Sequence, residues 1–179
     1  LVNNDDWQIK FVDENRYLKL NATDTGSTSY SNYTATDSVI KLGYTWNNDS
    51  SSHIAYSWHD VPGLQKFGIY EGNTTEGAFV ELGFRPAIIW IKSIDQTWYW
   101  NIHDSKRSPI NPGEGNFLRP DNNSVEGTAS GNNNIDFLSN GFKIRSTTAQ
   151  SEPTNVNGQT YFYAAWAEAP SINLYGAQA

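Results

Sequence analysis

Aromatic side chains are the most abundant residues in this sequence that could bind a ligand. The chain of 179 residues contains 7 Trp, 10 Tyr and 8 Phe. An aromatic ring buries apolar area against the C–H face of a sugar, while neighbouring polar groups bond to the hydroxyls. We expect this role in loops rich in Ser, Thr and Asn, where little core is available to bury a ring. The candidate glycan-binding residues are Tyr30, Tyr33, Tyr44 and Trp46.

Paired carboxylates are the second candidate, because glycoside hydrolases place two of them across the scissile bond. Asp13 with Asp104, and Asp60 with Glu168, occupy equivalent places in two halves of the chain that resemble one another. Arg107 follows Asp104 by three residues, a spacing that favours a turn or an ion pair after a strand. The Glu-x-Asp-x-x-Glu motif of jelly-roll glucanases is absent. We therefore predict no catalytic residues and a protein that is not an enzyme.

The sequence contains no recognisable metal or nucleotide motif. His53, His59 and His103 lack a spacing such as His-Glu-x-x-His, and neither a Gly-x-Ser-x-Gly elbow nor a Gly-rich phosphate loop occurs. Acidic clusters at 5–6, 13–15 and 121–123 offer oxygen ligands for calcium without the EF-hand arrangement. We expect no cofactor and no metal site, and calcium stays an open alternative.

Charge and composition exclude several classes of partner. The net charge is −7 and no cluster of Lys and Arg offsets it, whereas binding to phosphates needs a basic surface. The longest apolar runs, 87–91 and 161–167, are far shorter than the ~18 residues of a membrane span. The chain has no Cys, so disulfides and thiolate sites are excluded. We predict neither a nucleic-acid partner nor insertion into a membrane.

An internal repeat organises the chain. Residues 7–13 (WQIKFVD) match 98–104 (WYWNIHD), 17–19 match 117–119, Gly26 matches Gly127, and 53–62 (HIAYSWHDVP) match 161–170 (YFYAAWAEAP). The offset between the matches only grows along the chain, which indicates insertions in loops. Each copy is long enough to hold several strands, so we expect the two to share one core.

The repeat sets the predicted boundaries. Repeat one spans 1–62, repeat two spans 63–170, and 171–179 form a tail, all within a single domain. Repeat two has a long stretch of residues, 67–92, ahead of Trp98, whereas repeat one has only six residues ahead of Trp7. The chain also contains no Met. We expect this chain to be the C-terminal portion of a longer protein.

Residue preferences predict an all-β protein. Aromatic residues favour sheets and helix formers are scarce, so we expect an antiparallel β-sandwich. Segments 87–91 and 161–167 are apolar on both faces, which is typical of central strands. Segments 67–70 and 79–84 flank a predicted hairpin loop at 71–77, and Asn140-Gly141 predicts a two-residue type I′ hairpin. The matched pairs Trp7 with Trp98 and Trp58 with Trp166 are expected in the core.

Four segments of the second half carry a resemblance to a known family. They are 66–73 (KFGIYEGN), 77–87 (GAFVELGFRPA), 135–146 (IDFLSNGFKIRS) and 161–170 (YFYAAWAEAP). In this order they resemble a poorly characterised domain of virion structural proteins of tailed phages, especially those of marine cyanobacteria and other aquatic bacteria. The similarity covers 7–170. In that family the domain ends a longer protein assigned to tail fibres, appendages or head decorations.

The resemblance implies a non-enzymatic virion structural protein with a jelly-roll or concanavalin-like, lectin-type sandwich. It implies a location on the virion surface, with other virion proteins and further copies of the chain as partners, and a tail fibre or appendage role in host adsorption through a host-surface glycan. Three alternatives stay open. They are a free carbohydrate-binding module, a capsid decoration protein, and a glycoside hydrolase that acts as a depolymerase.

Overall fold

The computed structural model of the chain describes residues 8–10, 16–27, 34–36, 38–41, 54–74, 77–111, 116–127, 134–145 and 154–169. Every regular element in these ranges is a β-strand, and the strands pair antiparallel, which confirms the predicted all-β, antiparallel sandwich. No helix in this part of the chain is long and apolar enough to span a membrane.

The strands vary from two to eight residues in length. They are β1 (Gln8–Lys10), β2 (Tyr17–Lys19), β3 (Thr34–Ala35), β4 (Ile40–Lys41), β5 (Gln65–Glu71), β6 (Phe79–Glu81), β7 (Pro86–Ser93), β8 (Asn101–Asp104), β9 (Phe117–Leu118), β10 (Ile135–Leu138), β11 (Gly141–Ile144) and β12 (Thr160–Ala167).

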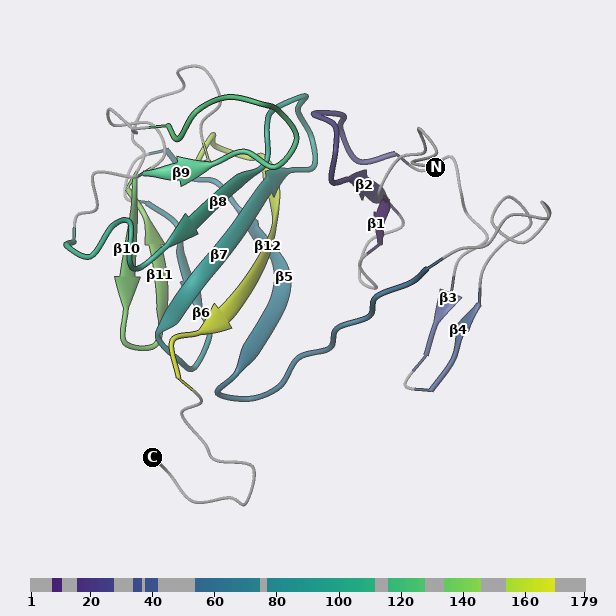
Figure 1. Cartoon of the computed structure of the whole chain (residues 1–179), viewed down its shortest axis with the longest axis horizontal. Coiled ribbons are helices and arrows are strands. Elements are labelled where there is room, and N and C mark those ends of the chain that lie inside the picture. The colour runs from purple at the N-terminus through teal and green to yellow at the C-terminus, as the bar shows by residue number, and fades with distance from the viewer. Residues whose placement is uncertain are drawn as a thin grey trace.

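Two sheets form the body of the molecule. The larger has the order β5-β12-β7-β8-β9 and the smaller has the order β10-β11-β6. The short pairs β1–β2 and β3–β4 complete the structure; Figure 1 shows β1–β2 beside the larger sheet and β3–β4 set apart from it. The predicted central strands 87–91 and 161–167 are confirmed, since β7 and β12 each have a strand on both sides.

The main core lies between the two sheets. Side chains alternate along a strand, so one set from β12, with Tyr161, Tyr163 and Ala165, faces the smaller sheet. We call this side of the larger sheet its interior face. The buried residues opposite and around them include Ile89, Ile91, Val80, Ile135, Phe137, Phe142 and Ile144.

A second apolar cluster covers the other side of the larger sheet, its outer face. Phe162 and Ala164 of β12 are buried there, with Phe67, Trp90 and Trp166 packed against them. Ring contacts run across the strands, with centroids 5.6 Å apart for Phe67–Trp166 and for Trp90–Trp166. Leu18 is buried in the same cluster, so β2 covers one end of this face.

Three polar contacts fix β1–β2 and the following loop to the larger sheet. The indole Nε1 of Trp100 donates to the carbonyl O of Lys19 at 2.7 Å, and the Gly26 amide donates to the Ile94 carbonyl at 2.7 Å. Arg16 Nη1 lies 2.8 Å from Asp95 Oδ1. Residues 16–27 and the larger sheet therefore pack as one unit around Trp100.

The loops 17–27 and 117–127 have the same backbone pattern. Tyr17 bridges Ser27 and Phe117 bridges Gly127, each through a pair of 3.0 Å hydrogen bonds. Ser27, rather than Gly26, therefore takes the place that Gly127 has in the second loop. This likeness supports a relation between these loops, and the wider two-repeat organisation remains a prediction.

The predicted hairpin around 71–77 is wrong. β5 pairs with β12 in the larger sheet, whereas β6 pairs with β11 in the smaller one, so the loop crosses between sheets. Gly72 forms a parallel bridge with Asn157, and Gly77 turns the chain with a φ of +73°. Close approach of backbones and a left-handed conformation both require glycine, which explains the turn-like sequence of this loop.

The Asn140-Gly141 hairpin exists, but its turn differs from the prediction. Leu138 pairs with Gly141, so the two loop residues are Ser139 and Asn140, and neither has the positive φ that a type I′ turn needs. Gly141 already belongs to β11, where a Cβ would collide with the carbonyl O of Val80. The glycine serves the close packing of β11 against β6.

Phe142 offers a test of the main core. Phe142 is completely buried, while Phe79, on the neighbouring strand β6, is 48% exposed. We expect Phe142→Ala to lower the free energy of unfolding by ~3–5 kcal/mol, because it leaves a cavity in a packed core. The matched control Phe79→Ala should cost less than about 1 kcal/mol. Denaturant unfolding measures both, and equal losses would contradict the assigned core.

Candidate functional site

The predicted glycan-binding residues Tyr30, Tyr33, Tyr44 and Trp46 lie outside the described residues. Their role therefore stays a prediction. Trp7, His53 and Asp13 lie outside the described ranges as well.

The expectation that Trp58 and Trp166 are equivalent core residues is wrong for Trp58. Trp166 is half-buried in the outer cluster and Trp98 packs against the main core, whereas Trp58 is 59% exposed. Trp166 lies on β12, between β5 and β7. Trp58 lies in a segment, 54–60, that pairs with no strand among the described residues, so it has no neighbouring strand of the kind that covers Trp166.

Segment 54–60 exposes a row of large apolar side chains. Ile54 is 82% exposed and Tyr56 is 66% exposed, and with Trp58 they occupy alternate positions. The Tyr56 and Trp58 rings stack with centroids 6.2 Å apart and planes 28° from parallel. Single exposed hydrophobic residues are ordinary, but three in one row indicate a binding surface.

The C-terminal end of this exposed segment is anchored to β5. The Phe67 amide donates to Asp60 Oδ1 at 2.9 Å, and Gln65 Nε2 donates to the His59 carbonyl at 2.8 Å. Val61 and Gln65 also exchange two backbone hydrogen bonds of 3.0 Å. Beyond this anchor the segment runs away from the larger sheet as an extended trace (Figure 1).

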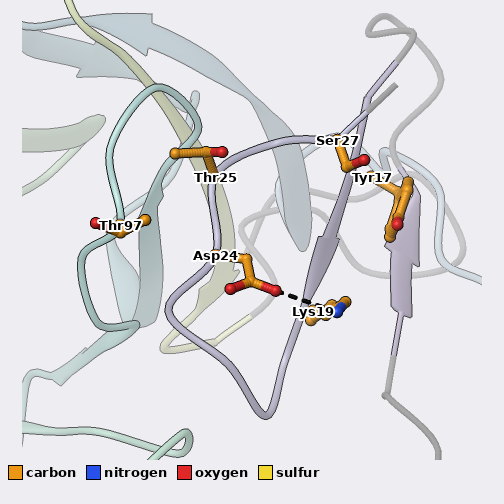
Figure 2. Close-up of a pocket in the computed structure, with 6 residues that line it drawn as sticks. All are labelled: Tyr17, Lys19, Asp24, Thr25, Ser27 and Thr97. Atoms are coloured by element: carbon orange, nitrogen blue, oxygen red, sulfur yellow. Dashed lines mark ion pairs between the residues drawn. The ribbon is translucent and has the colours of Figure 1, made fainter. Parts of the chain in front are cut away.

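A polar pocket lies where the loop after β2 meets the turn before β8. Its volume is about 260 Å³. Figure 2 shows its lining, in which Lys19 and Asp24 form an ion pair of 3.1 Å. The lining residues are Tyr17, Lys19, Asp24, Thr25, Ser27 and Thr97. Hydroxyl groups beside an ion pair suit a small hydroxylated ligand.

A buried lysine holds the loop beside this pocket in place. Lys92 Nζ donates to the carbonyl oxygens of Ser93 at 2.8 Å, Thr23 at 3.2 Å and Gln96 at 3.4 Å. Burial lowers the Lys92 pKa to about 8, and the nearby carboxylates of Asp121 and Asp24 act in the opposite direction. Because Lys92 is fully buried, we assign it to structure, as the tie between the N-terminal loop and β7.

Of the carboxylates that aligned in the two halves, the three within the described ranges, Asp60, Asp104 and Glu168, each have a cationic or amide partner. Asp104 accepts from the backbone amides of Lys106 and Arg107 and lies 2.6 Å from Arg107 Nε, which confirms the predicted turn and ion pair. Glu168 lies 2.7 Å from Lys106 Nζ and 3.4 Å from Arg85 Nε, and the lysine lowers its pKa. Both carboxylates thus have cationic partners near the surface.

His103 is a buried residue of β8. Burial lowers its pKa to about 4, with a smaller opposing effect from Asp104. Its Nε2 has no hydrogen-bond partner among the described protein atoms, and its ring lies 5.9 Å from that of Phe117. No group of three or more His, Asp or Glu side chains in the described ranges is placed to hold a metal ion.

Acid should destabilise the fold through His103. An unfolded chain has a histidine pKa near 6.5, so between pH 6.5 and about 4 the unfolded state binds more protons and stability falls as the pH falls. The full shift corresponds to about 3 kcal/mol. We expect His103→Phe to reduce the difference in unfolding free energy between pH 7 and pH 4. Denaturant titrations at both pH values measure it, and equal pH dependence in the two proteins would contradict the assignment.

Sequence reasoning missed both the polar pocket and the exposed segment. The pocket joins Lys19 and Thr97, which are remote in sequence. The exposed segment carries the pattern of a buried strand, so its sequence pointed to the core. The sequence signal that could have marked this segment as exposed is its position just before the turn at Pro62-Gly63, ahead of β5.

Comparison with known protein families assigns this chain to one family. Residues 3–170 match the model of a domain of unknown function, DUF7483, and the chain belongs to that family. Searches of curated proteins and of solved structures return no match.

Proposed function

We propose that this chain is a non-enzymatic structural module of a tailed-phage virion, within a tail fibre or appendage that takes part in host adsorption. The exposed row of Ile54, Tyr56 and Trp58 on a well-packed sandwich carries the proposal. A surface of this kind is more useful for binding or assembly than for catalysis, because it offers apolar contact area without an activated nucleophile. The resemblance of the second half to virion domains supplies the particle context.

The state of the polar groups supports a role without catalysis. Asp104 and Glu168 are paired with cations at the surface, and Asp60 accepts from a backbone amide. A general acid needs a raised pKa, whereas the pKa of Glu168 is lowered. His103, which has a strongly shifted pKa, is buried away from solvent.

A carbohydrate-binding role is the second candidate. The nearly parallel rings of Tyr56 and Trp58 form an exposed apolar surface, and the hydroxyl-rich pocket offers hydrogen-bonding groups elsewhere on the chain. In the virion such a site would contact a glycan on the host surface, whereas in a free module it would act without a particle. A capsid decoration role would use the same module on the head.

Location in the particle tests the primary proposal. We expect quantitative mass spectrometry of purified particles, produced from the genome that encodes this chain, to find its peptides at several copies per particle. Repeated modules on a virion surface are present in multiple copies because closed symmetric assemblies use identical subunits. Absence of these peptides from intact, infectious particles would refute the virion role, and a lysate of the same cells provides the detection control.

Glycan binding makes a separate prediction. On a glycan array, any signal of the isolated chain should fall by about fivefold or more for Trp58→Ala, because an aromatic contact contributes about 1 kcal/mol or more. Trp46→Ala tests the site predicted from sequence, and Ile110→Ala, at a 74% exposed position elsewhere, is the control. Release of reducing sugar from host polysaccharide, lost in Glu168→Gln, would instead establish the hydrolase alternative.

A further inference from the structure

The exposed segment 54–60 has the sequence of a central strand. In the match between 53–62 and 161–170, Ile54, Tyr56 and Trp58 correspond to Phe162, Ala164 and Trp166 of β12. These three β12 residues all lie on the outer face of the larger sheet, where they are buried or half-buried. The segment thus has the alternation of a strand with one apolar face, but no strand pairs with it within the described residues.

β5 lies at the edge of the larger sheet and offers backbone groups with which an added strand could pair. The amides of Gln65 and Phe67 donate away from β12, to the Val61 carbonyl and to the Asp60 side chain. The Leu64 carbonyl instead accepts from the Ala167 amide of β12, and the Gly72 amide donates to the Gln159 carbonyl just before β12. Peptide groups alternate in direction along an antiparallel strand, so those of Ile69 and Glu71 also point away from β12. No strand of the described residues pairs with this edge.

The outer face beside this edge is apolar. Phe67 is half-buried and Ile69 is 42% exposed, and both point to the outer face, since they alternate with Gly68 and the buried Tyr70 of the interior face. An added strand that placed its own apolar residues here would continue the row of rings formed by Phe67, Trp166 and Trp90.

The segment of the same chain cannot supply that strand in a favourable register. The Val61–Gln65 pair would place Ser57 opposite Ile69 and Trp58 opposite Gly68 if the hairpin continued. Tyr56 and Trp58 would then point to the interior face, where the core is already filled, and polar side chains would lie on the apolar face. A register shift of one residue would move Tyr56 and Trp58 to the apolar outer face. The turn between Val61 and Gln65 prevents that shift within one chain.

We propose that residues 54–60 of one copy add as a strand to the β5 edge of a second copy. Pairing between copies releases the register from the Val61–Gln65 turn, so Tyr56 and Trp58 lie on the outer face beside Phe67 and Ile69. Main-chain hydrogen bonds to Ile69 and Glu71 give affinity, and the ring contacts set the register. This inference goes beyond the virion role and does not depend on it, because it concerns only contacts between copies of this chain.

Oligomeric state tests the proposal first. At about 0.15 M salt, which screens the repulsion expected from a charge of −7, light scattering should show a mass that rises with concentration from 20.1 kDa to twice that value or more. Trp58→Ser with Tyr56→Ser should weaken association at least tenfold. Ile69→Pro should do the same without loss of the monomer fold, since the Ile69 amide points away from β12.

Matched controls separate strand addition from general stickiness. Ile110→Ser and Val125→Ser remove side chains that are 74% and 90% exposed elsewhere, and they should leave the association unchanged. A protein that stays at 20.1 kDa at every concentration, or an association that these controls weaken as much as the segment variants, would overturn the proposal.

Cysteine crosslinking then tests the register, because the natural chain has no Cys. Two singly substituted proteins are mixed under mild oxidation and run on a non-reducing gel. Tyr56→Cys or Trp58→Cys should crosslink with Ile69→Cys, and Ser57→Cys should not, because only residues on the same face bring their Cβ atoms within disulfide range. Preferential crosslinking of Ser57→Cys would overturn the proposal. In the double variant Ser57→Cys/Ile69→Cys, a disulfide within one chain between the two substituted positions would overturn it in favour of closure within one chain.

Discussion

The rest of the structure depends on the pairing of β12 with a strand on each side. That pairing satisfies the backbone of β12 along nearly its whole length, with seven residues in register with β5. It also fixes which side chains face which core: Tyr161 and Tyr163 fill the space between the sheets, while Phe162 and Trp166 carry the outer cluster. A slip of one residue would exchange these two sets, so the register is held by apolar burial on both faces.

Residues 16–27 pack on the outer face of the larger sheet and so belong to the same module. Leu18 packs among Ile94, Trp100 and Phe162, and Lys92 donates across the junction to the Thr23 carbonyl. A lysine buried there has to satisfy its charge with carbonyl oxygens, which makes the junction specific as well as apolar. The polar pocket beside it is a consequence of this contact between distant segments, as is the position of the Lys19–Asp24 ion pair.

Sequence patterns predict the all-β class and both central strands, because the apolar residues on both faces of 87–91 and 161–167 require cover on both sides of a sheet. They also predict the turn and ion pair at Asp104, which are local features. They fail where the outcome depends on tertiary pairing. Asn140-Gly141 has the sequence of a turn, yet Gly141 serves the approach of β11 to β6, and the predicted hairpin of β5 with β6 joins strands that lie in different sheets. The sequence around Trp58 fits a covered strand, and only the absence of neighbouring strands in the described structure leaves this ring exposed.

Segment 54–60 is, in our central proposal, a strand that gains its partner from another copy of the chain. Amide hydrogen exchange, measured residue by residue at low and at high protein concentration, tests this most directly, because hydrogen-bonded amides exchange slowly and solvent-exposed ones do not. Strand addition predicts that alternate amides of 54–60, together with those of Ile69 and Glu71, become protected only at high concentration, while the amides of β12 stay protected throughout. Exchange at 54–60 that is fast and independent of concentration, in protein whose β12 remains protected, would contradict it.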